Sequence, residues 1–128
     1  SFIKKGIFLE IIPNISEDTV FRKNVIGIKG NEDYNIILSR MKPIEFAVAF
    51  YSLSPKVKNF IASKVSDTAS VFLKDFFDNK IFPVAHINKG WIKSARKVFN
   101  DTAYFLSRIG KIYIVDNDGT DKKANTAN

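Results

Sequence analysis

The clearest folding signal is a long helical pattern in residues 87–110, INKGWIKSARKVFNDTAYFLSRIG. Apolar side chains recur there at helical spacing and form a stripe that should face a core. Gly110 stands where a left-handed residue commonly ends a helix. The predicted stripe contains Trp91, Ile92, Ala95, Val98, Phe99, Ala103, Phe105, Leu106 and Ile109. The opposite face is predicted to carry Lys89, Lys93, Arg96, Lys97, Tyr104 and Arg108.

Shorter helical patterns precede it, and each has a start signal. Ser66 can cap SDTASVFLKDFF, residues 66–77, whose apolar arc consists of Ala69, Phe72, Leu73, Phe76 and Phe77. Pro43 and the pair Ser54–Pro55 suit the first turns of two further helices. Asn31 can cap a helix over NEDYNIILSRM, residues 31–41, and Ser16 is a plausible cap further upstream, while NVIGIKG, residues 24–30, reads as extended or loop-like. The sequence therefore predicts an all-α, multi-helix bundle.

The ends of the chain are less regular. KIYIVD, residues 111–116, favours β structure and is expected to pack on the bundle or to pair weakly. We expect three parts: a linker or small helical segment in 1–30, a helical domain in 31–116 and a disordered tail in 117–128. No signal peptide or membrane span is recognisable, and the pattern starts abruptly, so a fragment of a longer cytoplasmic protein is expected.

The composition offers little for catalysis. The 128 residues include no cysteine and one histidine, His86, so a thiolate or multi-imidazole zinc site is excluded and His86 is expected to be structural or solvated. No phosphate loop, nucleophile elbow or HExxH motif occurs. Asp116, Asp118 and Asp121 lack the closing glutamate of a calcium loop. We therefore expect no enzyme, cofactor, metal or small-molecule substrate.

The net charge of +7 predicts attraction to an anionic partner, or simply a solubilising surface. One alternative function is nucleic-acid binding. The helices starting at Ser54 and Ser66 resemble a helix-turn-helix, and residues 111–116 resemble the wing of a winged helix. Against this, residues 66–77 carry one lysine and two aspartates, an unsuitable charge for approaching phosphates. Nucleic acid is therefore an unlikely partner.

Residues Ile36 to Val115 resemble the C-terminal domain of the bacterial flagellar motor switch protein FliG. The order and spacing of IILSRMKPIEFAVAFYSLSPKVKNFIASKVSDTASVFLKDFF, of FPV at 82–84 and of FLSRIGKIYIV at 105–115 are similar to that family's pattern. The resemblance implies an armadillo-like helical domain with a long last helix, placed in a rotor. Its expected partners are the cytoplasmic loop of the stator, other switch proteins and further copies in a ring.

The family's charged ridge meets the stator, and the matching positions here are Tyr51, Thr68, Asp75, Phe76 and Ala85. Of those five, only Asp75 keeps a charge, and steering by charge depends on several groups acting together. Phe76 also extends the apolar arc of its helix, toward a packing or docking face. The resemblance therefore implies a divergent paralogue with a reduced torque-generating surface, similar to the second copy that spirochaetes carry.

Two expectations complete this interpretation. The protein should lie in the cytoplasm, peripheral to the inner membrane, at the flagellar basal body or the cell pole, and should serve motility and chemotaxis. A scaffold that joins an assembly through Phe76, Phe77 and residues 1–30 is the other protein-binding alternative.

Overall fold

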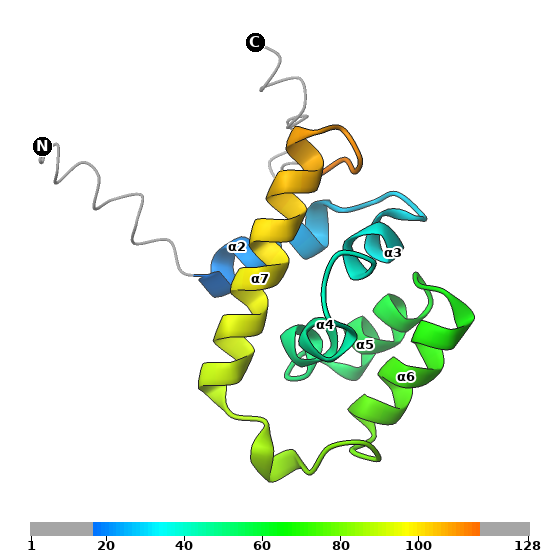
Figure 1. The fold of residues 1–128 in the computed structure, drawn as a ribbon, viewed down its shortest axis with the longest axis vertical. Helices are drawn as coiled ribbons and strands as arrows, with labels where there is room; N and C mark the ends of the chain where they lie inside the picture. Colours follow the sequence, from blue (N-terminus) through cyan, green and yellow to red (C-terminus); the bar gives the residue numbers. More distant parts are fainter. Residues whose placement is uncertain (1–16, 116–128) are drawn as a thin grey trace, which may run out of the picture.

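The computed structural model describes residues 17–115, which form six α-helices and one 3₁₀ turn without an extended strand (Figure 1). The elements are α2 Glu17–Gly27, α3 Asp33–Leu38, α4 Pro43–Phe50, α5 Pro55–Ala62, α6 Asp67–Phe77, η1 Val84–His86 and α7 Lys89–Arg108. The prediction of an all-α bundle with a long last helix is confirmed. The expected cap at Ser16, most of segment 1–30 and the tail 117–128 lie outside the described residues.

The predicted starts of α4, α5 and α6 agree with the structure. Ser54 Oγ accepts a hydrogen bond from the Val57 amide at 3.4 Å, and Ser66 Oγ accepts one from the Ala69 amide at 3.3 Å. Pro43 lies in the first turn of α4. These caps form because a serine oxygen pairs with an amide that has no partner inside the helix.

Two local predictions are wrong. Asn31 does not cap α3, which begins at Asp33 after Glu32; the Asn31 Oδ1 atom instead accepts a hydrogen bond from Lys64 Nζ at 3.1 Å. The stretch 24–27 is the last turn of α2 rather than a loop. Helix continues there because Asn24 is buried and donates to Asn100 Oδ1 on α7 at 3.0 Å, so tertiary contacts outweigh weak local propensity.

Helix α7 is the longest helix, and α2 and α4 pack against it. Figure 1 shows α5 and α6 on the other side of α4, with the segment 78–88 connecting α6 back to α7. Four fully buried rings meet where α2, α4 and α7 join: Phe21, Phe46, Phe50 and Phe99. Their edge-to-face and tilted contacts, with centroids 5.0–5.9 Å apart, are the geometry that aromatic quadrupoles favour.

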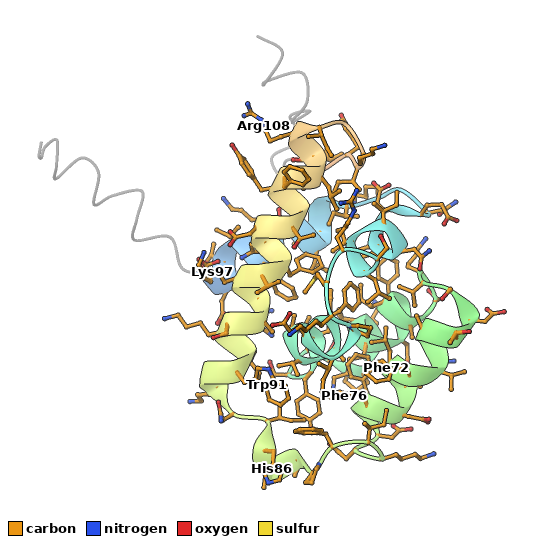
Figure 2. The ribbon with its side chains drawn as sticks, in the orientation of Figure 1. Phe72, Phe76, His86, Trp91, Lys97 and Arg108 are labelled. Carbon is orange, nitrogen blue, oxygen red and sulfur yellow. The ribbon has the colours of Figure 1, made fainter. Side chains whose placement is uncertain are left out.

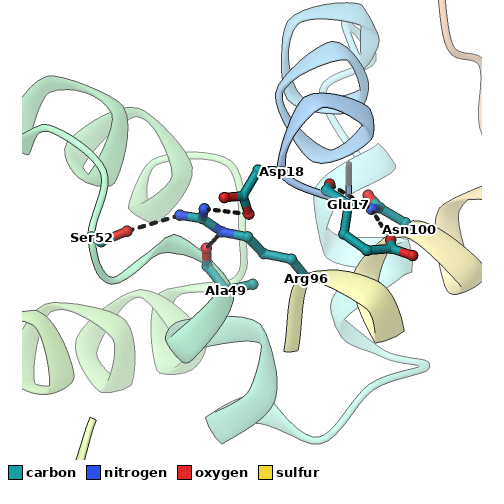
Figure 3. A network of polar contacts seen from close by, with 6 residues as sticks. All are labelled: Glu17, Asp18, Ala49, Ser52, Arg96 and Asn100. Carbon is teal, nitrogen blue, oxygen red and sulfur yellow. Dashed lines mark hydrogen bonds and ion pairs between the residues drawn. The ribbon is translucent and has the colours of Figure 1, made fainter. Parts of the chain in front are cut away.

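The predicted position of Arg96 on the exposed face of the last helix is also wrong, because the side chain lies in the core. Its side chain is 3% exposed and its guanidinium lies 4.8 Å from the Phe21 ring centroid. Figure 3 shows its polar contacts, in which it donates to the Ala49 carbonyl, the Asp18 carboxylate and the Ser52 hydroxyl, each at 2.9 Å. The arginine thereby connects α7 to the end of α4 and the start of α2.

The apolar stripe of α7 also ends earlier than expected. Phe105 and Ile109 are 53% and 47% exposed, since no described element covers that edge of the helix. Gly110 adopts the predicted left-handed conformation, with φ of 78°. The buried residues of the stripe are Ala95, Phe99, Ala103 and Leu106, and the partly buried Trp91, Ile92 and Val98 pack against the same core.

The segment after α7 returns to the start of the bundle. Ile112 and Ile114 are buried, and Ile114 forms an isolated antiparallel bridge with Ile28. The Gly27 carbonyl accepts a hydrogen bond from the Val115 amide at 2.9 Å, and a Cβ at Gly27 would collide with the Val115 carbonyl oxygen. This confirms packing and weak pairing for residues 111–115, and it makes one continuous core across residue 30.

None of the helices in residues 17–115 combines the length and the apolar character needed to cross a bilayer.

Candidate functional site

The five ridge positions taken from the resemblance fall on three elements. Tyr51 follows α4 and is half-buried, Thr68 and Asp75 lie on α6, and Ala85 lies on the exposed turn η1. The fifth position, Phe76, is fully buried. The fold brings Tyr51 and Phe76 into ring contact, with centroids 6.0 Å apart.

Phe76 is the centre of a second aromatic cluster. Its ring contacts those of Tyr51, Phe72, Phe77 and Phe82, with centroids 6.0–6.5 Å apart. Figure 2 shows Phe76 on α6 and Trp91 on α7 directed into the interior, and the Trp91 ring lies 5.3 Å from that of Phe82. A side chain with no exposed surface cannot contact a partner, so the docking role expected of Phe76 is wrong and its packing role holds.

Thr68 and Asp75 share one face of α6 with Val71 and Phe72, because residues three, four and seven apart are neighbours on a helix. Val71 is 61% exposed and Phe72 is half-buried. This α6 face is defined by Thr68, Val71, Phe72 and Asp75. It presents more apolar surface than charge.

An apolar groove of about 500 Å³ lies next to the α6 face. Its walls come from the end of α3, the start of α4 and the first half of α6, and they consist of Asn35, Leu38, Ser39, Pro43, Ser66, Thr68, Ala69 and Phe72. The groove has a fixed wall because Asn35 Oδ1 accepts a hydrogen bond from the Ser66 amide at 3.1 Å. We call it the α3–α6 groove.

A cation from α5 lies at the opposite edge of α6. Lys58 Nζ on α5 lies 4.9 Å from the Tyr51 ring centroid and 5.3 Å from that of Phe77. Partial burial lowers the pKa of Lys58, although the nearby Asp78 carboxylate acts in the other direction. The ammonium therefore places a positive charge beside Tyr51, one of the positions that the resemblance matches to a charged ridge.

Tyr51 itself is held in place by a hydrogen bond. Its hydroxyl donates to Asn79 Oδ1 at 2.6 Å, and Asn79 adopts a left-handed backbone with φ of 62° at the end of α6. Asparagine is among the few non-glycine residues that accept this conformation readily. The turn after α6 therefore fixes the ring on which the Lys58 ammonium lies.

Two exposed cations of α7 have local partners of their own. Lys97 Nζ pairs with Asp101 at 3.0 Å, and this hydrogen bond raises the pKa of Lys97. Arg108 lies over the Tyr104 ring, with 5.7 Å from its guanidinium carbon to the ring centroid. Since Arg96 is buried, the basic face expected on α7 is smaller than the sequence suggested.

Reactive groups do not converge in the described region. His86 is exposed on η1 with its ring 5.8 Å from that of Phe82, and residues 17–115 hold no group of three potential metal-ligating side chains. The β contact beside the helices is the isolated Ile28–Ile114 bridge, so this part of the chain contains no two-stranded wing.

Sequence reasoning missed Asn79 and the α3–α6 groove, and it identified Lys58 as a nearby charge without placing it against Tyr51 and Phe77. Each arises from elements that are brought together only by the fold. Arg96 carried a usable signal: Ile92, Arg96, Phe99 and Ala103 recur at i, i+4, i+7 and i+11, which places the arginine on the core stripe.

Comparisons with protein-family models, with curated proteins and with solved structures each found no match to this chain.

Proposed function

We propose that this chain is a non-enzymatic component of a flagellar rotor or motor switch, a divergent paralogue that binds rotor or stator proteins through a surface poor in charge. The observation that carries the proposal is the α6 face, where the single acid Asp75 lies beside exposed Val71, half-buried Phe72 and the apolar α3–α6 groove. The resemblance of residues 36–115 to the switch protein gives the proposal its cellular setting.

The mode of binding follows from this surface. The groove can accept an apolar side chain of a partner protein, and contacts of this kind gain affinity from water released on burial. The single carboxylate of Asp75, which is half-buried, adds little, since single ion pairs near the surface contribute roughly 0–1 kcal/mol. Binding should therefore depend weakly on salt, unlike contact through a full ridge of charges.

In the cell, the proposed site of action is the cytoplasmic side of the inner membrane, at flagellar bases or at the pole. Tagging the full-length protein tests this directly: foci that coincide with flagellar bases support the proposal. Diffuse fluorescence or nucleoid staining in motile cells would contradict it.

Binding to a partner is tested by titrating the protein with a stator cytoplasmic loop, and separately with purified switch proteins, at low and moderate salt. We expect binding that changes little with salt, is weakened by Phe72→Ser and is nearly unchanged by Asp75→Ala. Strong binding that disappears with salt and with Asp75→Ala would show that the charged surface still works.

The nucleic-acid alternative has its own signature in the same titrations. Duplex DNA in place of protein should bind weakly at physiological salt, because the candidate recognition helix α6 begins with Asp67 and carries Asp75. Micromolar binding that falls steeply with salt would favour that function over the one proposed.

A further inference from the structure

We propose that the hollow between α5 and the C-terminal end of α6 is an acceptor site for one carboxylate side chain of a partner protein, with Lys58 as its cationic contact. This inference deepens the proposed function and rests on it, because it requires that the chain bind a protein.

The site is a defined hollow. It has a volume of about 320 Å³ and is lined by Pro55, Lys58, Asn59, Lys74, Phe77 and Asp78. Two lysines, one amide and one acid therefore surround a space that is walled on two sides by a proline and an aromatic ring. Its size suits a single side chain.

The Lys58 ammonium is held in position before any ligand arrives. It lies near the faces of Tyr51 and Phe77, and Tyr51 is fixed by its hydrogen bond to Asn79. A lysine usually loses much rotational freedom when it binds an anion, and a lysine already confined between rings loses less. Preorganisation of this kind favours a specific contact.

Within residues 17–115 the Lys58 ammonium forms no ion pair. The ion pairs among residues 17–115 are Arg96–Asp18 and Lys97–Asp101, so neither Lys58 nor Lys74 has a carboxylate within 4.0 Å in this region. Because Lys58 is partly buried, its ammonium loses part of its hydration. The carboxylate of a partner would replace that lost hydration with an oppositely charged hydrogen-bond acceptor. Such a charge-assisted hydrogen bond is stronger than a neutral one.

The hollow selects a monoanion with apolar neighbours. Its formal charges, Lys58 and Lys74 against Asp78, leave a small positive excess that suits one carboxylate. A phosphate dianion would exceed this excess, because Asp78 and the negative end of α6 repel its two charges more strongly than the single charge of a carboxylate. Phe77 and Pro55 can cover the methylene groups or the aromatic neighbour of a partner's acidic residue.

The direct test uses a blocked Gly-Glu-Phe peptide as the probe and the isotope-labelled protein in nuclear magnetic resonance titration. We expect shifts at the amides of Lys58, Asn59, Phe77 and Asp78, and much smaller shifts with the Gly-Gln-Phe peptide. Equal shifts from both peptides, or larger ones from inorganic phosphate at the same concentration, would overturn the assignment.

Variants sharpen the test. Lys58→Gln should weaken binding of the glutamate peptide by about ten-fold or more, since it removes a charged hydrogen-bond donor. Lys58→Arg should retain most of the affinity, and Lys93→Gln, at an exposed lysine of α7, should retain all of it. Circular dichroism establishes that each variant is folded. Equal binding by wild type and Lys58→Gln would overturn the inference.

Failure of this inference can be told apart from failure of the proposed function. If the wild-type chain binds a rotor or stator protein and Lys58→Gln binds it equally well, the acceptor site is wrong and the proposed function stands. If the chain binds no motor protein while the glutamate peptide still shifts the hollow, the proposed function is wrong and the carboxylate site remains.

Discussion

The two aromatic clusters of this protein use the same residue type in opposite ways. Where α2, α4 and α7 meet, Phe21, Phe46, Phe50 and Phe99 are all fully buried. Around α6, Phe76 alone is fully buried, and the rings that surround it reach the surface: Tyr51, Phe72, Phe77 and Phe82 are half-buried. The first cluster can only stabilise the fold, whereas the second also forms a wall of the groove and of the hollow.

The difference teaches where function can reside in a small helical bundle. The core between α7, α2 and α4 excludes water. Its buried cation, Arg96, donates hydrogen bonds to three polar partners. The α5–α6 region leaves Lys58 without an ion pair in the described chain and exposes Val71. A change in the first region should affect stability, and a change in the second should affect binding.

The largest effect is expected from Phe99→Ala. Removing a fully buried ring at the junction of three helices should lower the free energy of unfolding by about 3–5 kcal/mol, through lost burial and the cavity that remains. Phe77→Ala, at the half-buried cluster, should cost less than half as much. Denaturant unfolding measures both, and equal losses would remove the distinction between the clusters.

Arg96→Ala should lower the free energy of unfolding by about 2–3 kcal/mol, the next largest effect. The substitution leaves the Ala49 carbonyl without the guanidinium donor and removes the contact to the Phe21 ring. Lys93→Ala is the matched control on the exposed side of α7 and should leave the unfolding midpoint unchanged. A mild effect of Arg96→Ala would show that the α2–α4–α7 region does not depend on its buried cation.

Alkaline pH should weaken the fold through Tyr34. Burial, with a smaller contribution from Asp33, raises the pKa of this phenol above its ordinary value of about 10. The native state therefore keeps a proton that the unfolded state loses. Stability is full below pH 10 and should fall above it by up to about 1.4 kcal/mol per pH unit.

The control for this pH dependence is Tyr34→Phe. This variant lacks the titrating hydroxyl and therefore also the 2.7 Å hydrogen bond that the hydroxyl donates to the Val25 carbonyl. Its stability should start lower, by about 1 kcal/mol, and should fall less steeply between pH 9.5 and 11. Parallel curves for the two proteins, followed by circular dichroism, would mean that Tyr34 is not the group responsible.

The smallest stability effect comes from the start of α6. Ser66→Ala removes the cap whose oxygen accepts the Ala69 amide and should cost about 1 kcal/mol. Ser94→Ala, at an exposed interior position of α7, should instead be neutral or slightly stabilising. If both serines behave alike in thermal unfolding, the cap does not hold the groove wall in place.

Local signals in the sequence predicted the local structure well. Ser54, Ser66, Pro43 and Gly110 act within one helical turn of their own positions, so their roles could be inferred without a fold. The burial of Arg96 could have been predicted, since its spacing places it on the core stripe, but its hydrogen-bond partners could not. Its partners Ala49 and Ser52 lie more than forty residues away in the sequence, and no local pattern reveals them.

The candidate site was less accessible to sequence reasoning. The resemblance directed attention to α6, and Thr68 and Asp75 do share a face. The inward direction of Phe76 follows from the apolar arc of its helix and not from the resemblance. The α3–α6 groove joins three helices, and the Lys58 hollow depends on the left-handed turn at Asn79. Both are products of tertiary packing, which periodicity and capping do not specify.

The central claim is that the α6 face contacts a motor protein, and site-specific photocrosslinking in cells tests it most directly. A photoreactive residue would replace Val71, which is 61% exposed, in the full-length protein, and Lys93 on α7 would serve as the control position. The account predicts an adduct with a rotor or stator protein, identified by mass spectrometry, from position 71 and not from position 93. Adducts with nucleic acid alone, or the same adducts from both positions, would contradict it.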